Sequence, residues 1–294
     1  MGLLTKLMCL RANRIYRVSA GLIGKLTSLQ EMWIESEMDD RTQFVKALGK
    51  LTKLRVLRIR LSNYEPDERP NRGLLDCLHN LHKIQMVDIY ASSGKKSVMW
   101  EVGHVSPKCL RHLCLQTLKF CRFPMWLNSS FLPNLCYLEL QVMALMVQDM
   151  ETLGRLPELN YLKLDSDYIA TVSTGGTSGD VYFLKLRIFK APRSFVWFDL
   201  HNIICNEKAI MPSLESLKFT VHVRFLRDAN LLRFDKQLGF GNLGRISLQK
   251  VKADIYCAGA HIKEVEEVVS GTLEEYLFKE LKLTSTVLVL ISKR

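Results

Sequence analysis

The spacing of apolar residues along the chain changes in a repeated way. In the stretch LGKLTKLRVLRIRLS, Leu51, Leu54 and Leu57 are three residues apart, and Ile59 follows after only two. A helix would return to the same face every three to four positions, and a strand would alternate from its start. The pattern therefore predicts a tight turn that leads into a short strand, whose alternate side chains point inward.

The same four-point pattern occurs ten times along the chain. The third apolar position of each copy, here called the third anchor, defines the register: Leu10, Met32, Leu57, Val87, Leu113, Leu138, Leu162, Phe189, Leu217 and Ile246. The intervals between these anchors run from 22 to 30 residues and average about 26, which is the range of leucine-rich repeats apart from one long member.

Stacked copies predict an α/β solenoid, because each copy can bury its apolar anchors only against the next. We expect a horseshoe with a parallel sheet on the concave face and helices or irregular segments on the convex face. Residues 39–51 predict one such helix, with Phe44, Val45 and Leu48 at helical spacing. A leucine-rich helical bundle is disfavoured because loop signals such as SNYEPDERPNRG separate the copies. We expect the repeats to fill residues 1–258 and a helical or irregular tail to fill 259–294.

The amino-acid sequences of several copies resemble one particular class of leucine-rich repeats. The phrases IGKLTSLQEMWIE, TQFVKALGKLTKLRVLRI, MPSLESLKF and FGNLGRISLQKV, with CAGAHIKEVEEVVS near the end, resemble the C-terminal leucine-rich-repeat region of plant nucleotide-binding disease-resistance receptors of the cereal, coiled-coil class. The resemblance covers about residues 1–270. It implies a protein of defence and innate immunity. Its partner would be a pathogen effector, a guarded host protein, or a nucleotide-binding domain held inactive in trans.

The chain departs from that class in two places. The phosphate-binding loop of that class has the motif G-x-x-x-x-G-K-[ST], and Gly24-Lys25 is the most similar stretch in this chain. It lacks both the upstream glycine and the following Ser or Thr, so we expect no switching by nucleotide binding. The end GTLEEYLFKELKLTSTVLVLISKR does not match the class either. We therefore expect a repeat region alone, from a truncated gene or a fragment, and a non-functional product stays open as an alternative.

Residues beside the third anchors are expected to face outward from each strand, on the concave side. We take fourteen of them as the candidate protein-binding face because they include the aromatic and arginine residues that dominate protein interfaces. These are Trp33, Glu35, Arg58, Arg60, Asp88, Tyr90, His112, Tyr137, Glu139, Tyr161, Lys163, Asp165, Lys218 and Arg245.

Composition narrows the class of protein further. The net charge of +11 favours acidic partners, but the basic residues are scattered rather than clustered, which disfavours nucleic acid. None of the eight cysteines forms a C-x-x-C pair, and most lie in apolar stretches, which predicts reduced, buried thiols in the cytoplasm, with the nucleus as an alternative. The start is a poor signal peptide and the apolar run at the end is too short for a bilayer, so we expect no membrane partner.

No catalytic site, cofactor or metal is expected. Cys109, His112, Cys114 and Cys121 lie within thirteen residues, but the repeat register directs them to different faces, which disfavours zinc. The loop STGGTSGD lacks the second glycine of a nucleophile elbow. A substrate receptor of a ubiquitin ligase is the alternative function, and an extracellular receptor is a further, disfavoured class. The substrate receptor of a ubiquitin ligase would need an F-box-like segment before the repeats, and an extracellular receptor would need a signal peptide and flanking cysteine pairs.

Overall fold

The computed structural model describes residues 4–15, 19–36, 41–61, 77–91, 107–166, 170–173, 183–192, 196–199, 211–222, 248–257 and 288–293. The chain forms two compact units, Met1–Met143 and Ala144–Arg294.

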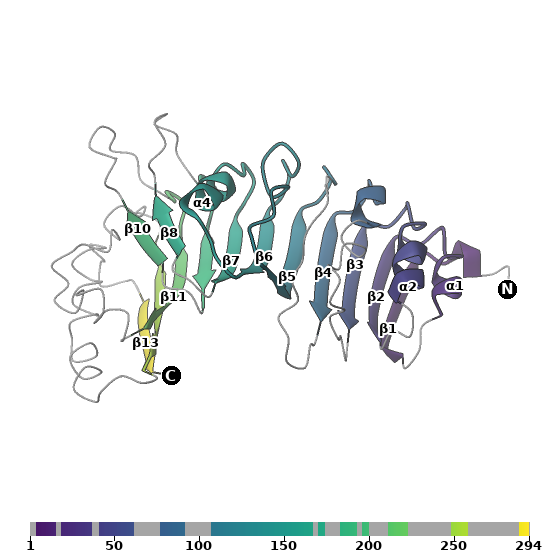
Figure 1. Ribbon diagram of the computed structural model, residues 1–294, viewed down its shortest axis with the longest axis horizontal. Helices are drawn as coiled ribbons and strands as arrows, with labels where there is room; N and C mark the ends of the chain where they lie inside the picture. The colour runs from purple at the N-terminus through teal and green to yellow at the C-terminus, as the bar shows by residue number, and fades with distance from the viewer. Residues whose placement is uncertain are drawn as a thin grey trace. The chain divides into compact units, whose positions relative to one another are not determined.

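The first unit is a parallel sheet of six strands in chain order, with short helices in the connections (Figure 1). Each strand pairs with the next strand along the chain, as stacked coils require. Its elements are the 3₁₀ helix η1 (Leu4–Lys6), β1 (Cys9–Ile15), α1 (Ala20–Ile23), β2 (Glu31–Ser36), α2 (Arg41–Leu48), β3 (Val56–Leu61), the 3₁₀ helix η2 (Cys77–Asn80), β4 (Met86–Ala91), β5 (His112–Phe120) and β6 (Tyr137–Val142).

The change of spacing within each copy has a simple origin in the backbone. The N–H of Leu54 donates to the carbonyl of Leu51 at 2.9 Å, which closes a tight turn, and the strand begins two residues later. Leu51, Leu54, Leu57 and Ile59 are all fully buried. Apolar side chains three apart therefore reach the core from the turn, and side chains two apart reach it from the strand.

Successive coils are joined by one carbonyl that serves two donors. The carbonyl of Gln30 accepts hydrogen bonds from the N–H groups of Arg55 and Val56, at 2.8 and 3.0 Å. The carbonyl of Arg55 accepts from the next coil in the same way. Because the carbonyls of Met8, Gln85 and Arg111 repeat this arrangement at the same place, the third anchors come into register: Leu57 lies opposite Met32 on one side and Val87 on the other.

Helix α2 forms where the sequence predicts it. It presents Phe44, Ala47 and Leu48 to the core, and all three are buried. The three side chains recur at helical spacing, so one face of the helix contributes to the core that the anchors form.

The second unit contains a parallel sheet in the order β7-β9-β11-β12-β13 and a parallel pair of β8 and β10. Its elements are α4 (Val147–Gly154), β7 (Tyr161–Ser166), β8 (Ala170–Ser173), β9 (Ile188–Ala191), β10 (Val196–Asp199), β11 (Ser216–His222), β12 (Lys250–Tyr256) and β13 (Leu288–Lys293). Strands β8 and β10 follow β7 and β9 in the chain, so two successive coils each add a strand outside the main sheet. The sequence did not predict this second sheet.

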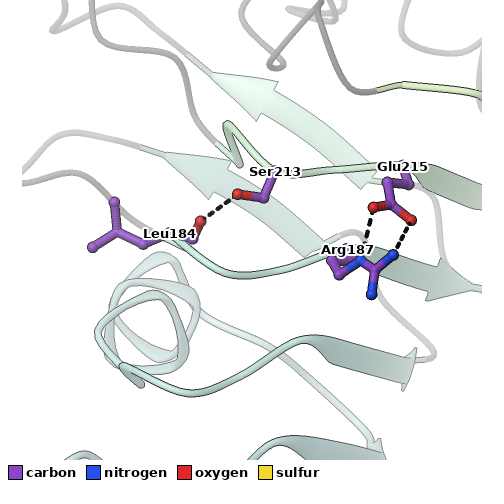
Figure 2. A network of polar contacts seen from close by, with 4 residues as sticks. All are labelled: Leu184, Arg187, Ser213 and Glu215. Carbon is purple, nitrogen blue, oxygen red and sulfur yellow. Dashed lines mark hydrogen bonds and ion pairs between the residues drawn. The ribbon is translucent and has the colours of Figure 1, made fainter.

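Polar contacts link successive coils of the second unit on the turns before the strands (Figure 2). The guanidinium group of Arg187 donates to both carboxylate oxygens of Glu215, at 2.7 and 2.9 Å. The hydroxyl of Ser213 donates to the carbonyl of Leu184 at 2.8 Å. In the first unit, Asn134 holds the position equivalent to Ser213, and its side-chain amide donates to the carbonyl of Lys108 at 2.8 Å. This contact is thus a repeated feature of the turns.

The predicted register of the tenth copy was wrong. Leu217 lies opposite Val251, not Ile246, and Ile246 itself is outside the described residues. Two overlapping matches share Leu248: a complete one places the third anchor at 246, and a partial one, with Arg245 at its first position, places it at 251. Leu248, Val251 and Ala253 are buried, and this match sets the sheet register.

The tail that was expected to be helical or irregular contains a strand. Residues Leu288–Lys293 form β13, which pairs in parallel with β12 and places Val289 opposite Val251. The run VLVLIS is rich in β-branched residues, which favour strands. The predicted boundary between the repeats and the tail, at residue 258, stays a prediction. The parallel-sheet solenoid itself is confirmed, within each unit, by the strand order and register.

Candidate protein-interaction surface

The side chains that alternate with the buried anchors form rows across neighbouring strands, on the outward face of each sheet. The register of the first unit places these residues at three levels: one before the third anchor, one after it and three after it. The first level holds Cys9, Glu31, Val56, Met86, His112 and Tyr137; the second holds Arg11, Trp33, Arg58, Asp88, Cys114 and Glu139; and the third holds Glu35, Arg60 and Tyr90.

At the second level, an indole ring lies between two guanidinium groups. Arg11 and Arg58, on the strands that flank Trp33, have their guanidinium carbons 4.3 and 4.4 Å from the centroid of the ring. Arg58 also forms an ion pair with Asp88, its neighbour at the same level on β4, and its Nε lies 2.8 Å from Oδ2 of Asp88. Arg11 is held by Glu31 at 3.0 Å. Cation–π stacking and ion pairing therefore fix the conformations of neighbouring side chains.

On β5 and β6 an aromatic pair at the first level contacts an acidic group at the second level. His112 stacks on Tyr137, with ring centroids 3.9 Å apart, and the hydroxyl of Tyr137 hydrogen bonds to the carboxylate of Glu139. Burial lowers the pKa of His112 below its ordinary value; Asp88 and Glu139 oppose this shift and Arg58 adds to it. At the third level the guanidinium carbon of Arg60 lies 5.7 Å from the centroid of the Tyr90 ring.

In the second unit the second level is a row of lysines. The pairings Lys163–Lys190, Lys190–Lys218 and Lys218–Lys252 place one lysine on each of four adjacent strands. Lys163 and Lys218 were among the predicted contact residues, and Lys190 and Lys252 were not. Lys252 was missed because of the wrong tenth register. Lys190 lies in a weak copy of the repeat, but it directly follows the predicted third anchor Phe189, so the same rule would have found it.

Two predicted contact residues differ from expectation in their exposure. Glu139 and Asp165 were expected to be accessible, but each is only 6% exposed. Glu139 is covered because it accepts the hydrogen bond from Tyr137 beside it. Asp254, at the third level of β12, is fully buried and was not predicted; its carboxylate lies 3.4 Å from Nζ of Lys218 and 3.7 Å from Nζ of Lys252. Arg245 lies outside the described residues.

The exposure of the cysteines differs from the predicted burial. Among the seven in the part of the chain that the structure describes, only Cys77 is buried, while Cys9 and Cys109 are exposed and the others are half-buried. Cys9 and Cys114 occupy outward positions in the rows, which explains their exposure. The described residues contain no group of three or more His, Cys, Asp or Glu side chains that could hold a metal ion.

No helix within the described ranges is both long and apolar enough to cross a membrane. A search of curated proteins found no match to the chain. The family described as the leucine-rich repeat region matches residues 1–277, which is nearly the whole length. Solenoids of this kind offer an extended surface for binding proteins. Repeat spacing, strand register and this match agree, and the chain belongs to the family of leucine-rich repeat regions.

Proposed function

We propose that the chain is a non-catalytic protein-recognition module that binds its partner through the outward face of the first unit. The observation that carries the proposal is the arrangement of Arg11, Trp33 and Arg58, in which an indole ring is held between two guanidinium groups. Tryptophan and arginine are among the residues that dominate the binding energy of protein interfaces.

The fixed conformations of these side chains support the proposal. A side chain that is already ordered loses little conformational entropy on binding, so more of its contact energy appears as affinity. Trp33 and Arg58 hold each other, and Asp88 holds Arg58 from the other side. Trp33 remains half-buried rather than covered, so part of the ring can still be contacted.

The finer part of the proposal is a role in plant defence. The phrases around Trp33 and Leu57 resemble the repeat region of plant disease-resistance receptors. We propose that the partner is a pathogen effector or a guarded host protein, or else a nucleotide-binding domain that the chain holds inactive in trans, and that binding takes place in the cytoplasm.

Proximity labelling in cereal leaf tissue tests both parts. The chain is expressed with a labelling enzyme, and the labelled proteins are compared with those of a Trp33→Ala/Tyr90→Ala/Tyr137→Ala variant. We expect a defined set of proteins to be lost from the variant. Recovery of immune receptors or their guarded proteins in that set would support the defence role.

A matched control keeps the experiment specific. Lys53 and Arg55 are exposed residues in the turn before β3, away from the three rows. A Lys53→Ala/Arg55→Ala variant should label the same proteins as the parent. Identical labelling by the triple variant and the parent would overturn the proposed surface, and a lost set without any component of immune signalling would overturn the defence role.

A further inference from the structure

The row of lysines on the second unit is a charged surface of a different kind from the aromatic row of the first. We define the lysine row as Lys163, Lys190, Lys218 and Lys252. These residues lie side by side on β7, β9, β11 and β12. All four are half-buried. Neighbouring strands of a sheet are about 4.8 Å apart, so the row spans about 14 Å.

Direct cross-strand neighbours of the same charge destabilise a sheet. The row contains three such neighbouring pairs. The carboxylate of Asp254 lies close to the ammonium groups of Lys218 and Lys252, and Nζ of Lys190 lies 5.0 Å from the centroid of the Tyr161 ring. These contacts hold the side chains of Lys190, Lys218 and Lys252 over the sheet. A ligand that brings negative charge to the row would relieve the remaining repulsion.

The balance of charge limits what that ligand is. The outward face carries five lysines, the four of the row and Lys250 at the first level of β12, and two buried carboxylates, Asp165 and Asp254, so the formal surplus is five minus two. Nucleic-acid binding relies on many phosphate contacts, each of which releases a counterion. A surplus of three positive charges beside fixed carboxylates suits a ligand with a few spaced carboxylates better than it suits a polyphosphate.

The spacing points to a helix. An α-helix brings one side chain per turn to the same face, so acidic residues that alternate i+3 and i+4 steps lie about 5.4 Å apart along its axis, close to the separation of neighbouring lysines. Four such residues span about 16 Å against about 14 Å for the row, whereas four same-side residues of an extended peptide, about 6.6 Å apart, span about 20 Å. From the register and this spacing we infer that the lysine row binds the acidic face of an α-helix of a protein partner, lying across the strands. The inference rests on the proposed protein-recognition function. It adds a second binding surface, on the second unit, and the chemical class of the ligand for that surface.

The test uses the full chain and a defined probe. The probe is a fluorescein-labelled, helix-forming peptide with glutamates along one face at alternating i+3 and i+4 steps, and the control peptide has glutamine at those positions. Binding is followed by fluorescence anisotropy at low and physiological salt. We expect the glutamate peptide to bind, to bind more weakly as salt increases, and to bind more tightly than the glutamine peptide.

Variants then locate the site. Lys163→Gln/Lys190→Gln removes two charges without touching the two lysines beside Asp254, and should weaken binding about tenfold, the sum of two partly exposed ion pairs. Lys50→Gln/Lys53→Gln changes the net charge equally at two exposed positions before β3, and should leave the affinity unchanged. If circular dichroism shows that the Lys163→Gln/Lys190→Gln variant is unfolded, Lys163→Arg/Lys190→Arg keeps the charges and should bind like the parent.

Several results would overturn the inference. These are no binding of the glutamate peptide, equal binding of the glutamine peptide, equal weakening by the two glutamine variants, or loss of binding in the arginine variant. Single-stranded RNA and phosphatidylserine vesicles are tested in parallel, and tighter binding of either through the same lysines would assign the row to that ligand instead. Because the labelling experiment above alters only the first unit, a failure here leaves its outcome intact, and the two proposals can fail separately.

Discussion

The imidazole ring of His112 stacks almost parallel on the phenol ring of Tyr137, with centroids 3.9 Å apart and an angle of 12° between the planes. The two residues are direct partners on β5 and β6, so the strand register alone brings the rings together. The stack covers one face of the imidazole, and this burial disfavours its charged form. A histidine in this position is expected to resist protonation while the chain is folded.

The first prediction concerns the dependence of stability on pH. The pKa of His112 is lowered in the folded chain from its ordinary value of 6.5. As the pH falls below 6.5, the unfolded chain therefore binds more protons at this residue than the folded chain does. The contribution of His112 to stability is therefore complete above pH 6.5 and declines as the pH falls below it. Urea unfolding at a series of pH values measures this decline.

A His112→Phe variant serves as the control because it retains an aromatic ring and removes the titrating group. Its free energy of unfolding should fall less than that of the parent between neutral pH and pH 5. Equal declines in the two proteins, or an NMR titration that gives His112 a pKa above its ordinary value, would contradict the prediction.

The second prediction compares two adjacent residues on β3. Leu57 is fully buried and Val56 faces outward and is half-buried. Leu57→Asp should lower the free energy of unfolding by several kcal/mol, enough to prevent soluble folding, because a buried carboxylate without partners is costly. Val56→Asp should cost much less. Circular dichroism and urea unfolding of both variants measure the difference, and equal stability would show that the inward and outward positions are misassigned.

The register of most of the sheet could be predicted from the sequence because its signal is local. The third anchor lies at a fixed distance from the turn, and the buried positions of Leu57, Leu113 and Leu217 agree with the prediction. The signal failed at the tenth copy because both Ile246 and Val251 follow a suitable anchor, and only pairing with β11 selects between them. A local pattern cannot decide between two matches that share residues.

The candidate surface was less predictable than the fold. Sequence position places Trp33 and Arg58 on the outward face, but the stacking of Arg11 and Arg58 on one ring depends on which residues the neighbouring strands bring opposite Trp33. The burial of Glu139 likewise depends on its hydrogen bond with Tyr137. These properties arise from contacts between side chains, and spacing along the chain does not encode them directly.

The third prediction separates the two kinds of contact between turns that Figure 2 shows. Ser213→Ala removes a hydrogen bond to the carbonyl of Leu184 and should lower the free energy of unfolding by about 0.5–1 kcal/mol, with little dependence on salt. Glu215→Gln removes the charge that pairs with Arg187, whose side chain is 62% exposed. Its effect should be small and should fade at high salt.

Urea unfolding at low and high salt tests this pair of variants. An Asn134→Ala variant repeats the Ser213 experiment at the equivalent turn of the first unit, where the amide donates to Lys108. Its loss of stability should resemble that of Ser213→Ala. A salt-dependent loss in Ser213→Ala, or a salt-independent loss in Glu215→Gln, would show that the two contacts have been assigned the wrong physical character.

The fourth prediction concerns the buried carboxylate of Asp254. Two lysines approach it, from the same strand and from β11, so either one can offset its charge when the other is removed. Lys218→Met or Lys252→Met alone should therefore be tolerated. The double variant leaves the carboxylate buried without either ammonium group and should lose about 3–5 kcal/mol, more than the sum of the single changes.

A triple variant tests whether the charge is the cause. Adding Asp254→Asn to the double variant removes the carboxylate and should restore much of the lost stability, since breaking a buried pair is costly while replacing the whole group is often tolerated. Urea unfolding of the five proteins completes the cycle. Additive losses in the double variant, or no recovery in the triple variant, would mean that the lysines stabilise β11 and β12 through their alkyl chains rather than by compensating Asp254.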